Sequence, residues 1–435
     1  MACYHGALTD RQTLCTAAAM KQLRSTAPLG RERRRPSLRQ ARMPEVVRVN
    51  SKVGRVGPER QARVMLSFLA EPGEPVLGAL LRVCTPAEIV AAVSSGREPR
   101  AVLPGVGRGI GGLARAFARW SARLGQLPSP ERLAGWQRDG MRLVCPGESE
   151  WPTRLDDLGD ARPVVLWAQG SADLRFACLR SVSVVGARAA TGYGQHVATE
   201  MSAALAERGW CVISGGAYGI DASAHRGALG AEGVTVAVLA SGLSYGYPKG
   251  HHELFAAIAG QGVMISEWPP DRAPSRPGFL VRNRVIAALS CGTVMVEAAL
   301  RSGALSTARH ARDISRPLMA VPGPVTSRQS EGCHEVIREW GAVLVTRAQD
   351  VIENVSPVGE GLAVRRRGPA CSRDSLDPET TAVLEAIPAR GGAGTAAIAI
   401  TAGVDLNTAI RCLGALAATG FIERCPRGWR LRKNA

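Results

Sequence analysis

The sequence Val185-Gly186-Ala187-Arg188-Ala189-Ala190-Thr191-Gly192-Tyr193-Gly194 begins at the end of an apolar run and leads into a helical segment. A strand, a glycine-containing turn and a helix in this order form the first half of a βαβ unit. The turn differs from the dinucleotide fingerprint G-x-G-x-x-G, because Arg188 stands where that fold needs room for a pyrophosphate. A cation here favours a phosphate ligand, with a structural ion pair as the alternative.

The same alternation of apolar strand and amphipathic helix continues along the chain. The apolar runs that predict strands lie at 182–186, 211–214, 234–239, 263–266, 293–296 and 318–321. This order predicts an α/β fold with a parallel sheet and helices on both of its faces. Ligands of such sheets bind at the carboxyl ends of the strands, where the glycine-rich turns lie.

The second turn reads Ser214-Gly215-Gly216-Ala217-Tyr218-Gly219-Ile220-Asp221, and its glycines let backbone N–H groups approach a ligand closely. Asp221 and His225 stand four residues apart, so an acid/base pair is possible, but Asp near a helix start is also ordinary capping. The third strand leads to His251 and His252. Adjacent histidines face different directions on a helix and have no third ligand at metal spacing, so we expect no metal site.

A further segment, Phe279-Leu280-Val281-Arg282-Asn283-Arg284, places an aromatic ring, two guanidinium groups and a carboxamide close together. After the next strand comes the small, hydroxyl-rich turn Ser302-Gly303-Ala304-Leu305-Ser306-Thr307. Arginines bind phosphate oxygens, an aromatic face stacks on any base, and helix starts favour anions. Arg276, Phe279 and Arg282 are spaced by three, so they can point to one side. These groups bind a nucleic-acid backbone and supply no nucleophile, and we expect no catalytic residue.

The chain has 435 residues and a formal net charge of +17. Residues 1–60 hold 13 basic and 4 acidic residues, a net charge of +9, whereas 150–353 holds 19 of each. Any nucleic-acid footprint on the central region must therefore be a local patch. The 11 cysteines include no C-x-x-C pair, which argues against disulfides and zinc and favours a cytoplasmic protein. No apolar run reaches the roughly 18 to 20 residues of a membrane span, so no membrane insertion is expected.

The domain organisation follows from changes in pattern. The predicted parts are a basic, disordered leader at 1–57, a helical domain at 58–125, the α/β domain at 140–355, a linker at 356–376 and a C-terminal domain at 377–435. Met43 is an alternative start of the chain. The turn at 103–107 resembles the hairpin of helix-hairpin-helix and SAM-like modules, which contacts DNA; a plain interhelical turn is the alternative.

The C-terminal domain is predicted to hold helices at 378–387, 395–402 and 405–418 and a hairpin at 421–431, which is a winged-helix pattern. Its third helix carries Arg411 as the only cation. This favours protein contact or weak DNA binding over duplex reading.

Many short motifs occur in one order between residues 181 and 347. They are Ala187-Arg188, Tyr193-Gly194, Ser214-Gly215, Gly219-Ile220-Asp221, Ala224-His225, Ala237-Val238-Leu239, Tyr247-Pro248, Ser266-Glu267-Trp268-Pro269-Pro270, Arg282-Asn283-Arg284-Val285-Ile286-Ala287, Val296-Glu297-Ala298, Ser302-Gly303 and Ala320-Val321-Pro322-Gly323-Pro324. Together they closely resemble the DNA-processing protein A (DprA/Smf) family. The resemblance implies an extended Rossmann-like, doubly wound parallel sheet, an N-terminal SAM/helix-hairpin-helix-like domain and a C-terminal winged helix.

The resemblance also implies a function. Members bind single-stranded DNA, protect incoming strands in natural transformation, load the RecA recombinase and form homodimers through the Rossmann-like domain, without a cofactor. Carried over by motif and turn, the expected DNA-binding residues are Gly186, Arg188, Ser214, Gly215, Gly216, Gly219, Arg276, Phe279, Arg282, Asn283, Arg284, Ser302 and Gly303. This sequence departs from many members at Leu280, where they have Pro, and at His251, where they have Asn; the first change affects backbone stiffness rather than contact chemistry.

Two enzyme classes are the alternatives. The first is a nucleotide-processing Rossmann enzyme of the lysine-decarboxylase-like phosphoribohydrolase kind, which has a similar sheet. Such enzymes carry the turn P-G-G-x-G-T-x-x-E, and the corresponding turns of this chain, at 214–218 and 302–306, do not supply the Glu. An NAD-dependent enzyme is disfavoured by Arg188 and by the lack of an acidic residue after the second strand. A Walker-type ATPase is excluded, because no G-x-x-x-x-G-K-[ST] occurs.

Overall fold

The computed structural model describes residues 57–103, 106, 110–363 and 372–432. The predicted basic leader lies outside these ranges except for Gly57, and so does the middle of the predicted linker. Most of the hairpin predicted at 103–107 also lies outside them. Its DNA contact stays a prediction.

A nine-stranded sheet of order β1-β2-β6-β5-β4-β3-β7-β8-β9 forms the centre of the fold. Its parallel strands are β3 (Ser181–Val185), β4 (Cys211–Gly215), β5 (Thr235–Val238), β6 (Val263–Ser266), β7 (Gly292–Met295), β8 (Leu318–Ala320) and β9 (Val343–Leu344). The first six lie within one residue of the predicted strands. The predicted doubly wound parallel sheet is confirmed.

Three strands at the edges of the sheet were not predicted. β9 is one of them, and the other two, β1 (Met141–Val144) and β2 (Leu166–Gly170), extend the opposite edge. β2 pairs antiparallel with both β1 and β6. β9 is only two residues long, and the polar Arg142 and Gln169 interrupt the apolar runs of β1 and β2, so none of the three gives a continuous apolar signal.

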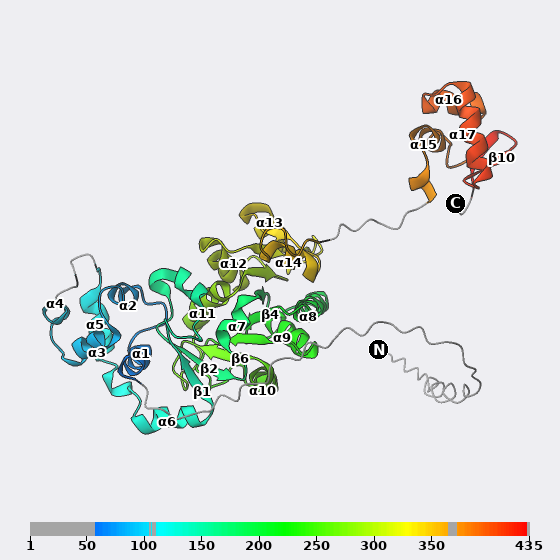
Figure 1. The fold of residues 1–435 in the computed structure, drawn as a ribbon. Coiled ribbons are helices and arrows are strands. Elements are labelled where there is room, and N and C mark those ends of the chain that lie inside the picture. Colours follow the sequence, from blue (N-terminus) through cyan, green and yellow to red (C-terminus); the bar gives the residue numbers. More distant parts are fainter. Residues whose placement is uncertain (1–56, 104–105, 107–109, 364–371, 433–435) are drawn as a thin grey trace, which may run out of the picture. The chain divides into compact units, whose positions relative to one another are not determined.

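Helices cover both faces of the sheet (Figure 1). One face packs against α8 (Gly192–Ala206), α9 (Ile220–Gly230), α10 (His252–Gln261) and α14 (Ala348–Val355). The other packs against α7 (Leu174–Leu179), α11 (Arg276–Leu289), α12 (Ala304–Asp313) and α13 (Glu331–Trp340). Neighbours such as Val184 and Val185 enter opposite cores. Because both faces are buried, the strands read as continuous apolar runs.

The described residues before the sheet form helices, as predicted. They are α1 (Pro58–Leu69), α2 (Pro75–Leu80), α3 (Pro86–Ser94), α4 (Pro99–Val102), α5 (Leu113–Ser121), the 3-10 turn η1 (Leu124–Gln126) and α6 (Pro130–Arg138). Several begin with Pro, whose fixed φ suits the first helical position. Thr85 and Glu88 form a capping box at α3. Leu66, Ile89 and Trp120 anchor a core shared by α1 to α5, whereas Trp136 of α6 packs into a core with the sheet.

The C-terminal part holds α15 (Pro378–Glu385), α16 (Thr395–Ala402), α17 (Leu406–Ala418) and the antiparallel strands β10 (Ile422–Cys425) and β11 (Gly428–Leu431). Three 3-10 turns complete the elements: η2 (Thr153–Ala161), η3 (Lys249–His251) and η4 (Ser372–Ser375). Three helices and a hairpin occur in the predicted order. The winged-helix assignment and the domain boundaries stay predictions.

No single helix in the described ranges has the length and apolar composition to cross a membrane; α16 and α17 meet that test only as a pair bent by 106°.

A buried ion pair fixes the middle of α11 to its surroundings. Arg284 Nη1 lies 2.6 Å from Glu267 Oε2, Arg284 Nη2 lies 2.7 Å from Glu267 Oε1, and both side chains are buried. The Arg284 Nε donates to the carbonyl of Ala161 at 2.9 Å, and Gly73 packs against the same guanidinium. The pair thus joins α11, the loop after β6, the end of η2 and the loop after α1.

We expect Glu267→Gln to lower the free energy of unfolding by about 3–5 kcal/mol, because it leaves the buried Arg284 without its counter-charge. The matched control is Glu339→Gln, which removes the partner of the exposed Arg338 and should cost less than about 1 kcal/mol. Chemical denaturation followed by tryptophan fluorescence measures both. Equal, small losses in the two variants would contradict the anchoring role of this pair.

Candidate functional site

A large cleft lies at the carboxyl edge of the sheet, between β3 and β7. The chain runs from β3 through α8 to β4 on one side, while β7 pairs with β3 on the other. Strand order reverses at this point, and the loops there diverge and leave a crevice. The cavity is about 770 Å³ and is lined by the β3–α8 turn, the β4–α9 turn, α11 and the loop before α12. We call this cavity, with Arg188, Phe279, Arg282 and Ser302 in its lining, the cleft.

Phe279 forms part of the wall of the cleft and is half-buried. The Arg188 Cζ lies 4.3 Å from the centroid of the Phe279 ring, and the Tyr247 ring lies 5.8 Å away at an interplanar angle of 62°. Phe279 belongs to none of the apolar cores. It is therefore a surface aromatic held by a cation and a second ring.

Arg282 lines the cleft but is buried, with 7% of its surface exposed. Its Nη1 donates to the carbonyl of Val238, while its Nε has no hydrogen-bond partner among the described residues. Burial lowers the pKa of Arg282 and raises that of the nearby Asp221, and each group opposes the other's shift. A guanidinium stays charged in proteins. A buried cation in the lining of an open cavity favours an anionic ligand.

Glycines let the turns of the cleft come together. A Cβ on Gly215 would collide with the Arg282 guanidinium and the Asp221 carboxylate. Gly219 has φ +79°, and a Cβ there would collide with the carbonyls of Ala187 and Arg188. At Gly186 a Cβ would lie 2.8 Å from the Glu297 carbonyl. These positions demand glycine for close approach, so they shape the cleft.

Beneath the second turn, His225 is completely buried. Its Nε2 lies 2.8 Å from the Gly215 carbonyl and its Nδ1 lies 2.7 Å from the Thr235 hydroxyl. Burial lowers the pKa of His225 to about 4, so the ring is neutral near pH 7, and Nε2 carries the proton because a carbonyl only accepts. Ser214 Oγ donates to the Val184 carbonyl at 2.6 Å. Both side chains support the turn rather than face a ligand.

On the far side of the cleft, Asn283 Nδ2 donates to the Gly303 carbonyl at 3.2 Å. The Ser302 Oγ accepts from the Ala304 N–H at 3.3 Å and so begins α12. Asn283, Ser302 and Gly303 all line the cleft, as does the exposed Arg276 at the start of α11.

The structure does not bring Arg284 to the cleft, contrary to the sequence-based expectation. Arg282 and Arg284 stand two residues apart on α11, and such residues point to nearly opposite sides of a helix. The Arg284 guanidinium is held by Glu267 instead. Of the other expected residues, Gly216 lines a small adjoining cavity of about 30 Å³ behind Phe279.

Arg301 and Tyr247 are among the side chains in the lining of the cleft that sequence reasoning missed. Arg301 lines the cavity next to Ser302, and its position beside the predicted turn was a usable signal. Tyr247 also lines it, brought there by a long loop after β5 that no local pattern places. The charged lining residues are Arg188, Arg276, Arg282, Arg301 and Asp221, a net charge of +3.

We expect acid to destabilise the protein through His225. The folded-state pKa lies below the ordinary value of 6.5, so the unfolded chain gains this proton first as the pH falls. Stability is therefore fully present above about pH 6.5 and is lost as the pH falls towards about 4. Thermal midpoints between pH 7.5 and 4.5 should fall less steeply in His225→Asn than in the unchanged protein. Parallel curves for the two proteins would contradict this assignment.

Comparison with known proteins identifies relatives of the chain. Residues 142–356 match the family described as DNA recombination-mediator protein A. A putative DNA processing protein DprA from Mycobacterium tuberculosis is 42% identical over 387 residues, which are 86% of this chain and 95% of that protein. Protein Smf from Escherichia coli is 40% identical over 222 residues, 51% of this chain and 58% of that protein.

The fold agrees with a solved relative. The X-ray structure of DNA processing protein A from Streptococcus pneumoniae matches with a TM-score of 0.55 and 28% identity, covering 70% of this chain and 99% of that one. The predicted family resemblance is confirmed on both sequence and structure: the chain belongs to the DprA/Smf family of DNA-processing proteins.

Proposed function

We propose that the protein binds single-stranded DNA in the cleft and acts on that DNA without breaking a covalent bond. The observation that carries the proposal is Phe279, a surface aromatic beneath the Arg188 guanidinium, with the buried Arg282 in the lining of the same cavity. An aromatic face and guanidinium groups bind base and phosphate without reading sequence. A flipped-out or unpaired base can reach the ring, whereas a base stacked in a duplex cannot.

The wider role that we propose follows from family membership. The protein protects incoming single strands and loads the RecA recombinase onto them in natural transformation and recombination, as a cytoplasmic homodimer formed through the Rossmann-like domain. The description of the family as a recombination mediator supports this role. In this proposal Gly186, Arg188, Gly215, Gly216, Gly219, Arg276, Phe279, Arg282, Asn283, Ser302 and Gly303 form the DNA site, and Ser214 holds its turn.

We further propose that the cleft is not an enzyme site. Asp221 is the carboxylate in its lining, and it supports the turn by accepting from the Ala217 N–H at 3.4 Å. Glu297 lies nearby, but its oxygens accept from the Thr191 N–H at 2.9 Å and hydroxyl at 2.6 Å, so it holds the start of α8. Release of free base from nucleoside monophosphates by the protein would refute this proposal and favour the phosphoribohydrolase alternative.

The domain assignment is also a proposal: a SAM/helix-hairpin-helix-like domain at 58–125, the Rossmann-like domain at 140–355, a linker at 356–376 and a winged helix at 377–435. In the last of these, Arg411 of α17 pairs with Glu379 at 2.6 Å, and Ile400, Leu406 and Ile410 are exposed. A neutralised cation among apolar side chains favours contact with protein over contact with duplex DNA.

We predict that Arg188→Ala weakens binding to all single-stranded sequences alike, because phosphate contacts carry no base information. The slope of log affinity against log salt should also fall by about one. Fluorescence anisotropy with labelled oligonucleotides at several salt concentrations measures both. The control is Arg208→Ala, which removes an exposed cation near the C-terminus of α8 that does not line the cleft. An unchanged slope in Arg188→Ala would contradict phosphate contact.

We predict that Phe279→Ala costs about 1–3 kcal/mol of DNA affinity with little loss of folding free energy, because the ring is half-exposed. Phe279→Trp should restore affinity. Phe117→Ala serves as the contrast, since that ring is buried and its loss should cost about 3–5 kcal/mol of stability. A Phe279→Ala protein that unfolds at clearly lower denaturant but binds DNA normally would rule out stacking.

A further inference from the structure

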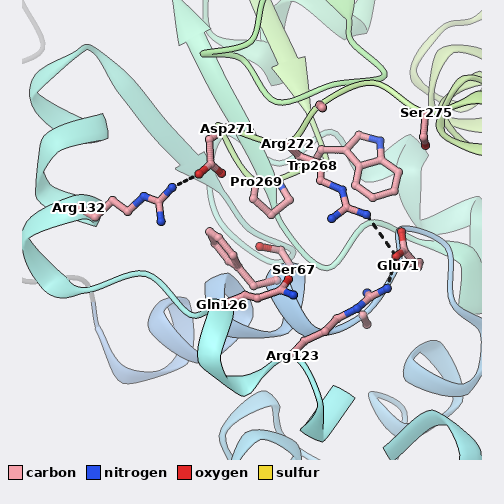
Figure 2. A pocket seen from close by; sticks show the side chains of 13 residues that line it. Ser67, Glu71, Arg123, Gln126, Arg132, Trp268, Pro269, Asp271, Arg272 and Ser275 are labelled. Carbon is pink, nitrogen blue, oxygen red and sulfur yellow. Dashed lines mark hydrogen bonds and ion pairs between the residues drawn. The ribbon is translucent and has the colours of Figure 1, made fainter. Parts of the chain in front are cut away.

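A second large cavity lies next to the residue that caps the start of α11, Ser275, which is part of its lining (Figure 2). It measures about 600 Å³ and is bounded by the end of α1, η1, α6 and the loop between β6 and α11. We call it the side pocket and define it by Phe68, Glu71, Arg123, Arg132, Trp268 and Arg272. It shares no lining residue with the cleft.

Charged groups in the side pocket leave one guanidinium available. The Arg123 Nη2 lies 2.5 Å from Glu71 Oε1, and its Nη1 donates to the Leu69 carbonyl at 3.1 Å. Arg272 Nη2 faces the same Glu71 oxygen at 3.7 Å, which is too long for a hydrogen bond. Figure 2 shows the two arginines reaching Glu71 from opposite directions. Arg272 therefore keeps its N–H donors for another acceptor, within the described part of the chain.

The remaining polar groups of the pocket are occupied or neutral. Arg132 pairs with Asp271, the Ser67 hydroxyl donates to the Val64 carbonyl at 2.7 Å, and the Ser275 hydroxyl caps α11. Gln126 is a neutral amide. Three guanidiniums against two carboxylates give the pocket a net charge of +1, and both carboxylates already have a cationic partner.

Aromatic rings complete the lining. Arg272 Cζ lies 5.5 Å from the centroid of the Trp268 indole, and the half-buried Phe68 faces the same cavity. An arginine held over an aromatic ring is the arrangement that Arg188 and Phe279 form in the cleft. Both cavities thus offer a guanidinium for phosphate. Because Trp268 is buried, with 7% of its surface exposed, the half-buried Phe68 is the more accessible ring of the side pocket.

The linings of the two cavities are adjacent along the chain at the start of α11. Ser275 lines the side pocket, and the next residue, Arg276, lines the cleft. A chain of linked nucleotides that leaves the cleft past Arg276 would have the side pocket as the next cavity along this helix start. No small ligand could occupy both cavities at once.

We propose that the side pocket is a second nucleotide subsite on the path of one bound strand, with Arg272 contacting a phosphate and Trp268 and Phe68 bordering the base. The proposal rests on the proposed binding of single-stranded DNA in the cleft. A free nucleotide has the same chemistry as a nucleotide of the strand, and the test separates the two sources. The contrasting account is that the ion pairs only fasten the helices to the sheet.

The test measures affinity for oligothymidylates of increasing length in the full-length protein. Arg272→Ala should leave the affinity for the shortest binding oligonucleotides unchanged and weaken that for long ones by about three- to tenfold, with a salt slope lower by about one. The matched control is Arg119→Ala, which removes a similarly exposed arginine paired with Glu74 at 3.0 Å outside the side pocket. Thermal midpoints of both variants report any loss of fold.

The variant Glu71→Gln distinguishes the two accounts, because only a phosphate subsite predicts an increase in DNA affinity. It removes the carboxylate that faces Arg123 and Arg272, so a phosphate subsite should bind long oligothymidylates about two- to fivefold more tightly. If the network only fastens the helices, the variant loses stability and gains no affinity. Photocrosslinking of strands that carry 5-iodouracil should also label Trp268 or Phe68 in long strands and not in the shortest.

Each outcome decides the proposal. The proposal is overturned if Arg272→Ala has the same affinities as Arg119→Ala for oligothymidylates of all lengths. It is also overturned if Arg272→Ala lowers the affinity for short and long strands equally. A second outcome also overturns the strand path. If thymidine monophosphate binds through Arg272 without competing with the shortest oligonucleotide, and Arg272→Ala does not weaken the binding of long strands, the side pocket is a site for free nucleotides. If the unchanged protein binds no oligonucleotide of any length, the proposed function itself is wrong, and with it this proposal. If the unchanged protein binds oligonucleotides but Arg272→Ala shows no loss confined to long strands, only the side-pocket proposal is wrong.

Discussion

The close approach of two glycine turns over a buried arginine is the constraint on which the site depends. Gly215 leaves no room for a Cβ because the Arg282 guanidinium lies against it, and Gly219 adopts a positive φ against the Arg188 carbonyl. Arg282 in turn donates to the Val238 carbonyl at the end of β5. The cation is thus held at the carboxyl edge of the sheet without an ion-pair partner within 4 Å among the described residues. The floor of the cleft is built by backbone geometry, and the nearby Asp221 carboxylate offsets part of the charge of Arg282.

The rest of the fold holds this floor in place. The neutral His225 ties the Gly215 carbonyl to Thr235 of β5, and Ser214 ties β4 to β3. Glu297 holds the first turn of α8 from the end of β7. On α11, one side of the helix presents Arg282 and Asn283 to the cleft and the other side buries Arg284 against Glu267. The same helix therefore forms the site and anchors it to the N-terminal helices.

The sequence predicted the parts of the site that depend on local pattern. The strands were placed within one residue, because runs buried on both faces are continuous and apolar. The turns holding Arg188 and Gly215 follow from glycine spacing. Arg284 was expected in the cleft because it lies close to Arg282 along the chain, but residues two apart on a helix point to nearly opposite sides. Tyr247 and Arg272 were missed, since loops and neighbouring helices bring them into place and no periodicity encodes that arrangement. The family resemblance led to the expectation of DNA binding and of a role for Arg276. Composition alone does not indicate this, because residues 150–353 carry equal numbers of basic and acidic residues.

The central claim, that single-stranded DNA lies in the cleft, is tested most directly by hydrogen–deuterium exchange of the full-length protein with and without a long oligothymidylate. The account predicts slower amide exchange in three segments, 186–191, 215–221 and 276–283, because bound nucleotides shield the backbone N–H groups of the turns and of the start of α11. Binding that leaves these three segments unchanged and slows exchange only in 377–435 would contradict it.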